Sequence, residues 1–469
     1  MTRDTELPRR AYLRTAGATA ALAALAGCGD DTSEPTTTPP TTTTTPPTRT
    51  TSRTGTTTDT TETGTTVNED RFGTVVNVVE AGADQTGESP VNPVLEEHVG
   101  DDTLLYFPPG RYRLADWELI GYRNLGIVGD DAALVPPEDE RDYWLLWGEL
   151  ENLLFAGFTL DCRAPGVAPV AHVSVSGGSS VVRDVTVRGH RRAPRSGFEV
   201  AATDPNAELR FENVALPDGS TSGNAIFVFP ESVGPLSFRN CRIEHWAEGL
   251  YAAYQSGSLA VVGGYYANNG IDQVRVGGAR DGAVVRGVTV RIDGPKQPEQ
   301  KPNMRGIWLE EGAKARIENC DVAVTDLAGT YSSGAIVVGR QFGRATIRNT
   351  RIRTDAETYA VHVRDPIDSL DGEWVPSMDR LPDEWRVSCR DVRIEGSATD
   401  LAAFRTTRRD DCRFERVCVD HPEGSRHGVS VAGAEGCAVR DATLDVSGEP
   451  IHSENATVET ARVRTDGSC

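Results

Sequence analysis

The sequence predicts an all-β fold, a parallel β-helix (solenoid) of about 13 coils, on two observations. Thirteen segments share a short, alternately apolar pattern with Gly, Asn or Asp at the fifth place, and most of their starts are 23 to 32 residues apart. Each repeat holds two or three short strands and no helix, so it cannot bury its apolar side chains without stacking on its neighbours. The starts lie at residues 125, 153, 180, 209, 236, 259, 283, 315, 345, 387, 412, 437 and 456.

The polar fifth place of the repeat is expected to form a corner of each coil. One spacing of 42 residues predicts an excursion from the solenoid near residues 366–383, and a second excursion is expected near residues 294–303. A β-propeller blade would need about 40 residues and four strands, and the regular leucines of a leucine-rich repeat are absent. Asparagine side chains at the corner are expected to stack as an amide ladder, formed by Asn213, Asn240, Asn319 and Asn349.

The start of the repeat region carries a further pattern. Residues 76–84 contain a Gly-Ala turn, residues 91–99 look helical, and residues 104–112 form a strand that ends in Phe-Pro-Pro-Gly-Arg-Tyr. This order resembles the N-terminal cap of the pectate-lyase superfamily, the pectin-lyase-like proteins. The resemblance implies a single-stranded right-handed parallel β-helix whose N-terminal capping helix covers the open end.

The N-terminal residues carry patterns that are typical of a targeting signal. Arg9 and Arg10, followed by Ala-Tyr-Leu-Arg, resemble the twin-arginine export motif, and a weakly apolar run over residues 15–26 ends in Leu-Ala-Gly before Cys28, which resembles a lipobox. The run is too short for a spanning helix, which needs roughly 20 residues. We therefore expect a lipid on Cys28 to anchor the mature chain at the extracellular face of the cell membrane.

Three domains are predicted: a lipoprotein signal over residues 1–28, a stalk over residues 29–70 and the β-helix over residues 71–469. In the stalk, 21 of the 35 residues from 32 to 66 are threonine. Such a segment has too few apolar side chains to bury a core, so we expect it to be disordered or extended.

The charge of the chain is strongly negative. It has 69 acidic and 48 basic residues, a formal charge of −21, and only three lysines among the basic residues. An acidic, lysine-poor composition that keeps arginine resembles that of extremely halophilic archaea. Nucleic acid is excluded as a partner because phosphates require a basic surface. We expect a monomer whose partner is a polysaccharide or surface glycan and which meets the membrane only through the lipid anchor.

The cysteines leave two readings open. Cys412 and Cys437 begin adjacent repeats, and adjacent coils lie about 4.8 Å apart, within the range of a disulfide. Both a Cys412–Cys437 disulfide and a plain stack of buried thiols fit this spacing. Cys241 and Cys320 are expected to be core residues. No Cys-x-x-Cys pair or His-rich cluster indicates a metal site; no cofactor is expected, and calcium is left unassigned.

Members of the pectate-lyase superfamily act on sugars at the outer face of one sheet, so the outward residues of the second strand in each repeat are the candidates here. Asp272 and Glu310 are expected about 8 Å apart, within the roughly 6.5–9.5 Å of inverting glycoside hydrolysis. Trp308 is expected to be exposed as a platform for sugar rings. The candidate catalytic residues are Asp272, Arg275, Glu310 and Glu311, and the candidate substrate-binding residues are Tyr251, Trp308, Arg340, His362 and Arg364. Arg275 also fits a plain salt bridge with Glu310 or Glu311.

Known active-site motifs of the superfamily are incomplete in this chain. The polygalacturonase pattern is echoed only by Asn-Gly-Ile-Asp at 269–272 and His-Gly-Val-Ser at 427–430, which are too far apart. The pectate-lyase Arg-x-Pro-x-x-Arg begins at Arg364 but has Ser369 at its last place. Two hypotheses stay open: a polysaccharide lyase or glycoside hydrolase, and a non-catalytic binding, adhesion or structural protein. The fold alone does not choose between them.

Overall fold

The computed structural model describes residues 69–278, 282–295, 303–373, 375–467 and 469. The chain divides into Met1–Thr66 and Val67–Cys469. Arg9, Arg10, Cys28, almost all of the predicted stalk and most of the 294–303 excursion lie outside the described residues.

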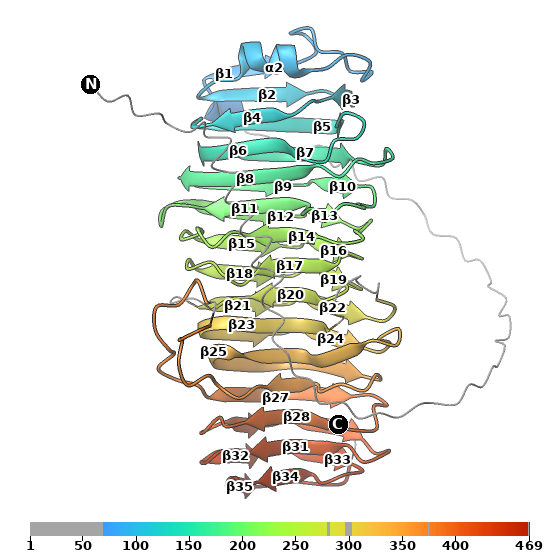
Figure 1. Cartoon of the computed structure of the whole chain (residues 1–469), viewed down its shortest axis with the longest axis vertical. Coiled ribbons are helices and arrows are strands. Elements are labelled where there is room, and N and C mark those ends of the chain that lie inside the picture. The colour runs from blue at the N-terminus through green and yellow to red at the C-terminus, as the bar shows by residue number, and fades with distance from the viewer. Residues whose placement is uncertain (1–68, 279–281, 296–302, 374, 468) are drawn as a thin grey trace, which may run out of the picture. The chain divides into compact units, whose positions relative to one another are not determined.

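The unit Val67–Cys469 is an all-β parallel solenoid of about 13 turns, which confirms the predicted fold class. Its strands stack as successive rungs along one axis (Figure 1). Within the described ranges every strand pairing is parallel, and the rungs align in three ladders. The helical segments found there are η1 (Glu69–Arg71) and α2 (Asn92–His98).

The first ladder carries the candidate site. It consists of β4 (Trp117–Ile120), β6 (Tyr143–Glu151), β8 (Val170–Gly177), β11 (Phe198–Ala202), β14 (Asn224–Val228), β17 (Glu248–Ala252), β20 (Asp272–Val276), β23 (Asn303–Glu318), β25 (Tyr331–Thr354), β26 (Val361–Val363), β28 (Ala402–Thr407), β31 (His427–Ala432) and β34 (Ile451–Glu454).

The second ladder holds the repeated pattern recognised in the sequence. It consists of β1 (Thr74–Asn77), β2 (Thr103–Phe107), β5 (Leu125–Val135), β7 (Leu154–Asp161), β9 (Ser179–Arg183), β12 (Glu208–Glu212), β15 (Leu236–Arg239), β18 (Leu259–Val262), β21 (Ala283–Arg286), the later parts of β23 and β25, β27 (Val387–Glu395), β29 (Arg413–Glu415), β32 (Cys437–Arg440) and β35 (Val458–Ala461).

The third ladder closes each turn. It consists of β3 (Gly110–Arg113), the ends of β5, β7, β25 and β27, and the short strands β10 (Thr186–Arg188), β13 (Ala215–Leu216), β16 (Arg242–Glu244), β19 (Tyr265–Ala267), β22 (Thr289–Ile292), β24 (Asp321–Val324), β30 (Cys418–His421) and β33 (Thr443–Val446).

The corner between the second and third ladders explains the polar fifth place of the repeat. Asn213, Asn240, Asn319 and Asn349 have φ of 55°, 51°, 55° and 49°, a left-handed conformation that Asn and Asp tolerate better than most other residues apart from Gly. The Asn213 amide donates to Asp184 on the preceding coil at 2.9 Å. The expected continuous amide ladder does not form, because the same corner is occupied by Gly263 and Gly287, also at positive φ.

The inward side chains of all three ladders form one continuous apolar core. Helix α2 lies at the N-terminal end of the stack (Figure 1), within the predicted range 91–99, and buries Leu95 in this core. Cys241 and Cys320 are buried in the core as expected.

Candidate functional site

The candidate site lies on the outer face of the first ladder. One column of side chains runs along it in register, coil after coil. The residues that alternate with it, such as Leu250, Val274 and Ile307, belong to the core, so the column points outward. We call this set the outer column: Tyr251, Arg275, Trp308, Val337, His362, Arg405, Ser430 and His452.

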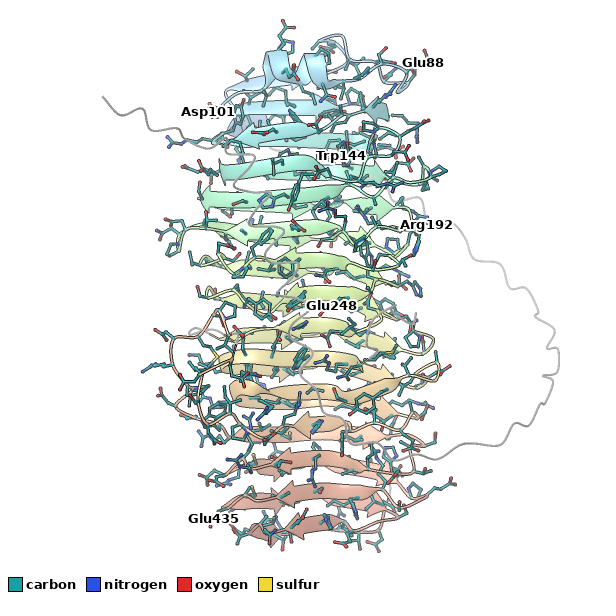
Figure 2. All side chains as sticks on the ribbon, in the orientation of Figure 1. Glu88, Asp101, Trp144, Arg192, Glu248 and Glu435 are labelled. Carbon is teal, nitrogen blue, oxygen red and sulfur yellow. A yellow bond between two sulfur atoms is a disulfide. The ribbon has the colours of Figure 1, made fainter. Side chains whose placement is uncertain are left out.

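Arg275 is the centre of a charged cluster on this face. Its guanidinium forms a bidentate ion pair with Glu310 and donates to Oε1 of Glu248 at 2.8 Å. Asp272 lies 3.9 Å from the same guanidinium and 2.9 Å from Nε of Arg305. Figure 2 shows Glu248 midway along the stack. The sequence alternative of a salt bridge between Arg275 and Glu310 is therefore the arrangement found.

Trp308 contacts the two guanidinium groups of this cluster. The Cζ atoms of Arg305 and Arg275 are 3.5 Å and 4.2 Å from its ring centroid. The Cζ atom of Arg275 is also 3.7 Å from the centroid of the Tyr251 ring. These are cation–π contacts, which gain strength when water is excluded. Trp308 is only 5 % exposed, so the expectation of an exposed tryptophan is wrong: its ring faces cations of its own chain.

Burial separates the protonation states of the acids. Burial raises the pKa of Asp272 well above its ordinary value, although Arg305 opposes the shift. Burial, with the charge of Glu310, raises the pKa of Glu311 to about 8. A pKa near 8 keeps the Glu311 carboxyl protonated at neutral pH, whereas the neighbouring Glu310 pairs with the Arg275 guanidinium.

A β-bulge brings Glu310 and Glu311 to the same site. The register between β23 and β25 shifts between Leu309 and Glu311, and such a shift re-aims the side chains beside it. The excursion between β26 and β27, orange in Figure 1, then folds beside β23 and β25. Its Ser377 donates through its backbone N–H and its hydroxyl to Oε1 of Glu311, at 3.0 Å and 2.6 Å.

The base of the excursion is fixed by Arg409. This side chain is fully buried and donates to five backbone carbonyl oxygens, including those of Arg364 and Trp385 at the two ends of the excursion. A depression of about 530 Å³ lies between the excursion and Ala313 of β23. The predicted 366–383 excursion thus borders the candidate site; its Trp374 lies outside the described residues.

The structure divides the predicted site residues into two groups. All four candidate catalytic residues, with Tyr251 and Trp308, lie together but are at most 8 % exposed, so the expected open carboxylate pair is wrong for this conformation. His362 and Arg364 are partly exposed, and the side chain of Arg340 is 41 % exposed and 3.6 Å from Asp365.

Three contributing residues were missed from the sequence: Glu248, Arg305 and Ser377. Arg305 pairs with Asp272 in the ladder, but Glu248 and Arg305 lie three residues before Tyr251 and Trp308. This odd offset is out of phase with the alternation of a strand, so the pattern gave no signal for them. Ser377 had no sequence signal, because the path of the excursion is set by tertiary contacts.

The structure distinguishes the two alternatives that the sequence left open for Cys412 and Cys437. Cys412 and Cys437 are buried free thiols, so the disulfide reading is wrong and the thiol stack is found. Both belong to the core, Cys412 directly before β29 and Cys437 as the first residue of β32, and both act as small apolar side chains. The disulfide forms between Cys418 and Cys469, which joins β30 to the last residue of the chain.

Among the described residues, no group of three or more His, Cys, Asp or Glu side chains could hold a metal ion. In the same part of the chain, no helix is long and apolar enough to cross a membrane.

No family model matches this chain, and no curated protein matches it. Several solved structures are similar, and three of them follow. The A-module of the mannuronan C-5 epimerase AlgE6 from Azotobacter vinelandii is 12% identical over 83% of this chain and 100% of its own, with a TM-score of 0.38. The catalytic unit of a GH87 α-1,3-glucanase from Streptomyces thermodiastaticus is 13% identical over 84% of this chain and 69% of its own, with a TM-score of 0.39. PfbA, a surface adhesin of Streptococcus pneumoniae, is 9% identical over 83% of this chain and 91% of its own, with a TM-score of 0.40. At TM-scores below 0.5 these likenesses carry no argument about function.

Proposed function

We propose that this chain is a surface protein that engages an acidic polysaccharide along the outer column. One observation supports this. The column is continuous and in register over eight coils. The exposure of its side chains changes along its length, from the buried cluster around Arg275 to the partly exposed His362 and Arg405. The buried cluster around Arg275 keeps this face rigid, and the partly exposed His362 and Arg405 contact the polysaccharide.

The contact residues suit a charged sugar. The rings of Tyr359 and His362 lie 4.6 Å apart and offer an aromatic surface for a sugar ring. Arg364 follows His362 by two residues, Arg340 lies 3.6 Å from Asp365, and Arg405 donates to Ser430 at 2.8 Å. Guanidinium groups bind carboxylates in a planar, bidentate geometry, which gives an acidic sugar an advantage over a neutral one.

Binding is tested with the purified chain and labelled polygalacturonate in high salt. The double variant His362→Ala, Arg405→Ala should weaken binding at least tenfold, because it removes a ring and a cation from the contact. The matched control is Arg123→Ala, whose exposed side chain lies on an N-terminal coil. Equal binding by the double variant and the wild type would exclude the outer column as the site.

Cleavage is the second candidate, and one observation favours it. Glu311 holds a proton beside the ion-paired Glu310, and two neighbouring carboxyls with separated pKa values are the arrangement that glycoside hydrolysis uses. In this reading Glu311 donates a proton and Glu310 or Asp272 is the second carboxyl, after the excursion opens. Reducing ends and unsaturated products distinguish hydrolase from lyase. Activity unchanged in Glu311→Gln, Glu310→Gln and Asp272→Asn would remove these roles.

Export and lipid anchoring complete the proposal. The Cys418–Cys469 disulfide supports it, because disulfides persist in oxidising, extracytoplasmic compartments. In cells, Cys28→Ser should release the chain from the membrane fraction, and Arg9→Lys with Arg10→Lys should block export. A membrane-bound Cys28→Ser chain would contradict the lipid anchor.

A further inference from the structure

A second site on the solenoid is lined by basic side chains, although the chain as a whole is strongly acidic. On the outer face of the second ladder, a depression of about 350 Å³ is lined by Gly282, Val284, Lys314, Arg316, Arg344 and Thr346. We call it the cationic depression. Val284, Arg316 and Thr346 are in register on β21, β23 and β25, and Lys314 is in register with Arg344.

The cations around this depression outnumber the acids. Glu318 is shared by three arginines, at 3.2 Å, 3.6 Å and 2.9 Å, and Glu384 is shared by two, at 3.3 Å and 3.4 Å. Lys314 is exposed and has no salt bridge within the described part of the chain. Five arginines therefore share these two carboxylates, and Lys314 lies beside them without an ion pair in the described residues; the arginines are Arg286, Arg316, Arg344, Arg348 and Arg386.

In the part of the chain that the structure describes, no carboxylate pairs with Lys314. Lys314 and Arg344 stand opposite each other on adjacent strands, about 4.8 Å apart along the ladder, and like charges at such positions destabilise the sheet. The chain as a whole has a formal net charge of −21, so a cluster in which arginines share carboxylates and Lys314 has none is not explained by composition. A bound anion would offset the repulsion.

The shape of the depression suits one acidic sugar unit. Gly282 has φ of +91°, and a Cβ there would meet Cγ of Lys314 at 2.8 Å, so glycine leaves room for the lysine stem. Val284 gives an apolar floor, and the Thr346 hydroxyl is a donor beside it. Arg316 and Arg344 can each present two N–H groups to a carboxylate or sulfate.

We propose that the cationic depression binds an anionic group of an acidic polysaccharide, as a second contact separate from the outer column. This inference rests on the proposed function and narrows the substrate class to polymers that carry carboxylate or sulfate groups. Because long-range attraction is screened in high salt, the contact acts through direct hydrogen bonds.

The test measures binding of the full chain to labelled polygalacturonate, dextran sulfate and neutral dextran. Lys314→Gln with Arg344→Gln should weaken binding of at least one acidic polymer tenfold or more. The control, Arg123→Gln with Arg462→Gln, changes the net charge equally at exposed sites on other coils and should leave binding within twofold.

The outcomes separate the two proposals. If the wild type binds no acidic polymer, the proposed function fails and this inference fails with it. If the outer-column variant His362→Ala, Arg405→Ala loses binding while Lys314→Gln, Arg344→Gln does not, the proposed function stands and the cationic depression is excluded. An equal loss in the charge-matched control, or equal binding of neutral dextran, also overturns the inference.

Discussion

Replacing Glu311 by glutamine should change how the stability of the solenoid depends on pH. The folded chain holds the Glu311 proton with a pKa of about 8, against an ordinary value of 4.5, because the carboxyl is buried beside Glu310. The folded state therefore binds this proton more tightly than the unfolded state. The resulting stabilisation is fully present below pH 4.5 and is lost as the pH rises to about 8.

The size of the effect follows from the shift. Each pKa unit corresponds to about 1.4 kcal/mol, so the free energy of unfolding should fall by about 3 kcal/mol between about pH 5.5 and about pH 8.5 through this group. With an unfolding entropy of roughly 2.1 cal/mol/K per residue, a domain of about 400 residues would lose about 4 °C in Tm. Glutamine mimics the protonated acid and does not titrate.

The assay is thermal unfolding by circular dichroism at constant salt across this pH range. Asp272 and the other acids titrate in both proteins, so the difference between wild type and Glu311→Gln isolates one group. We expect the Tm of the variant to fall about 4 °C less than that of the wild type. Parallel Tm curves would show that Glu311 does not hold its proton in the folded chain, and would remove the acid role proposed for it.

Three further predictions concern stability. Arg275→Met should destabilise the solenoid by about 3–5 kcal/mol, because it leaves buried carboxylates without their cation; a Tm unchanged at pH 7 would show that these acids are not ionised. Cys469→Ser opens the disulfide to Cys418, which closes a loop of 51 residues, and should cost about 4 kcal/mol; chemical reduction of the wild type is the comparison. Asn213→Ala should cost about 1 kcal/mol because its φ is positive, whereas Asn213→Gly should be close to neutral in the same melt.

The fold could be predicted because a solenoid repeats one local rule. Each coil needs inward apolar side chains and a corner residue that accepts positive φ. Residues such as Asn213 and Asn349 recur at this corner, so the requirement is visible in the sequence. The columns follow from strand register, so the pairing of Arg275 with Trp308 was also predictable, whereas the β-bulge that places Glu310 and Glu311 has no periodic signal.

Exposure could not be predicted in the same way. Alternation along a strand says only that a side chain points away from the core, and not whether another side chain then covers it. Trp308 points outward and is nevertheless buried against two guanidinium groups. The contact of Ser377 with Glu311 joins residues 66 positions apart through an irregular excursion, and no periodic pattern encodes such a path.

The preference of this chain for arginine over lysine has a structural reason beyond surface charge. Arg409 satisfies five carbonyl oxygens where the excursion leaves the stack, and Arg426 bonds two backbone carbonyls and the Thr354 hydroxyl. Burial lowers the pKa of both groups to about 10, so they remain charged at neutral pH. An ammonium group has three donors at one point and could not reach carbonyls spread over several coils. Lys314 sits instead in the cationic depression, where a compact charge at the surface can meet an anion from outside.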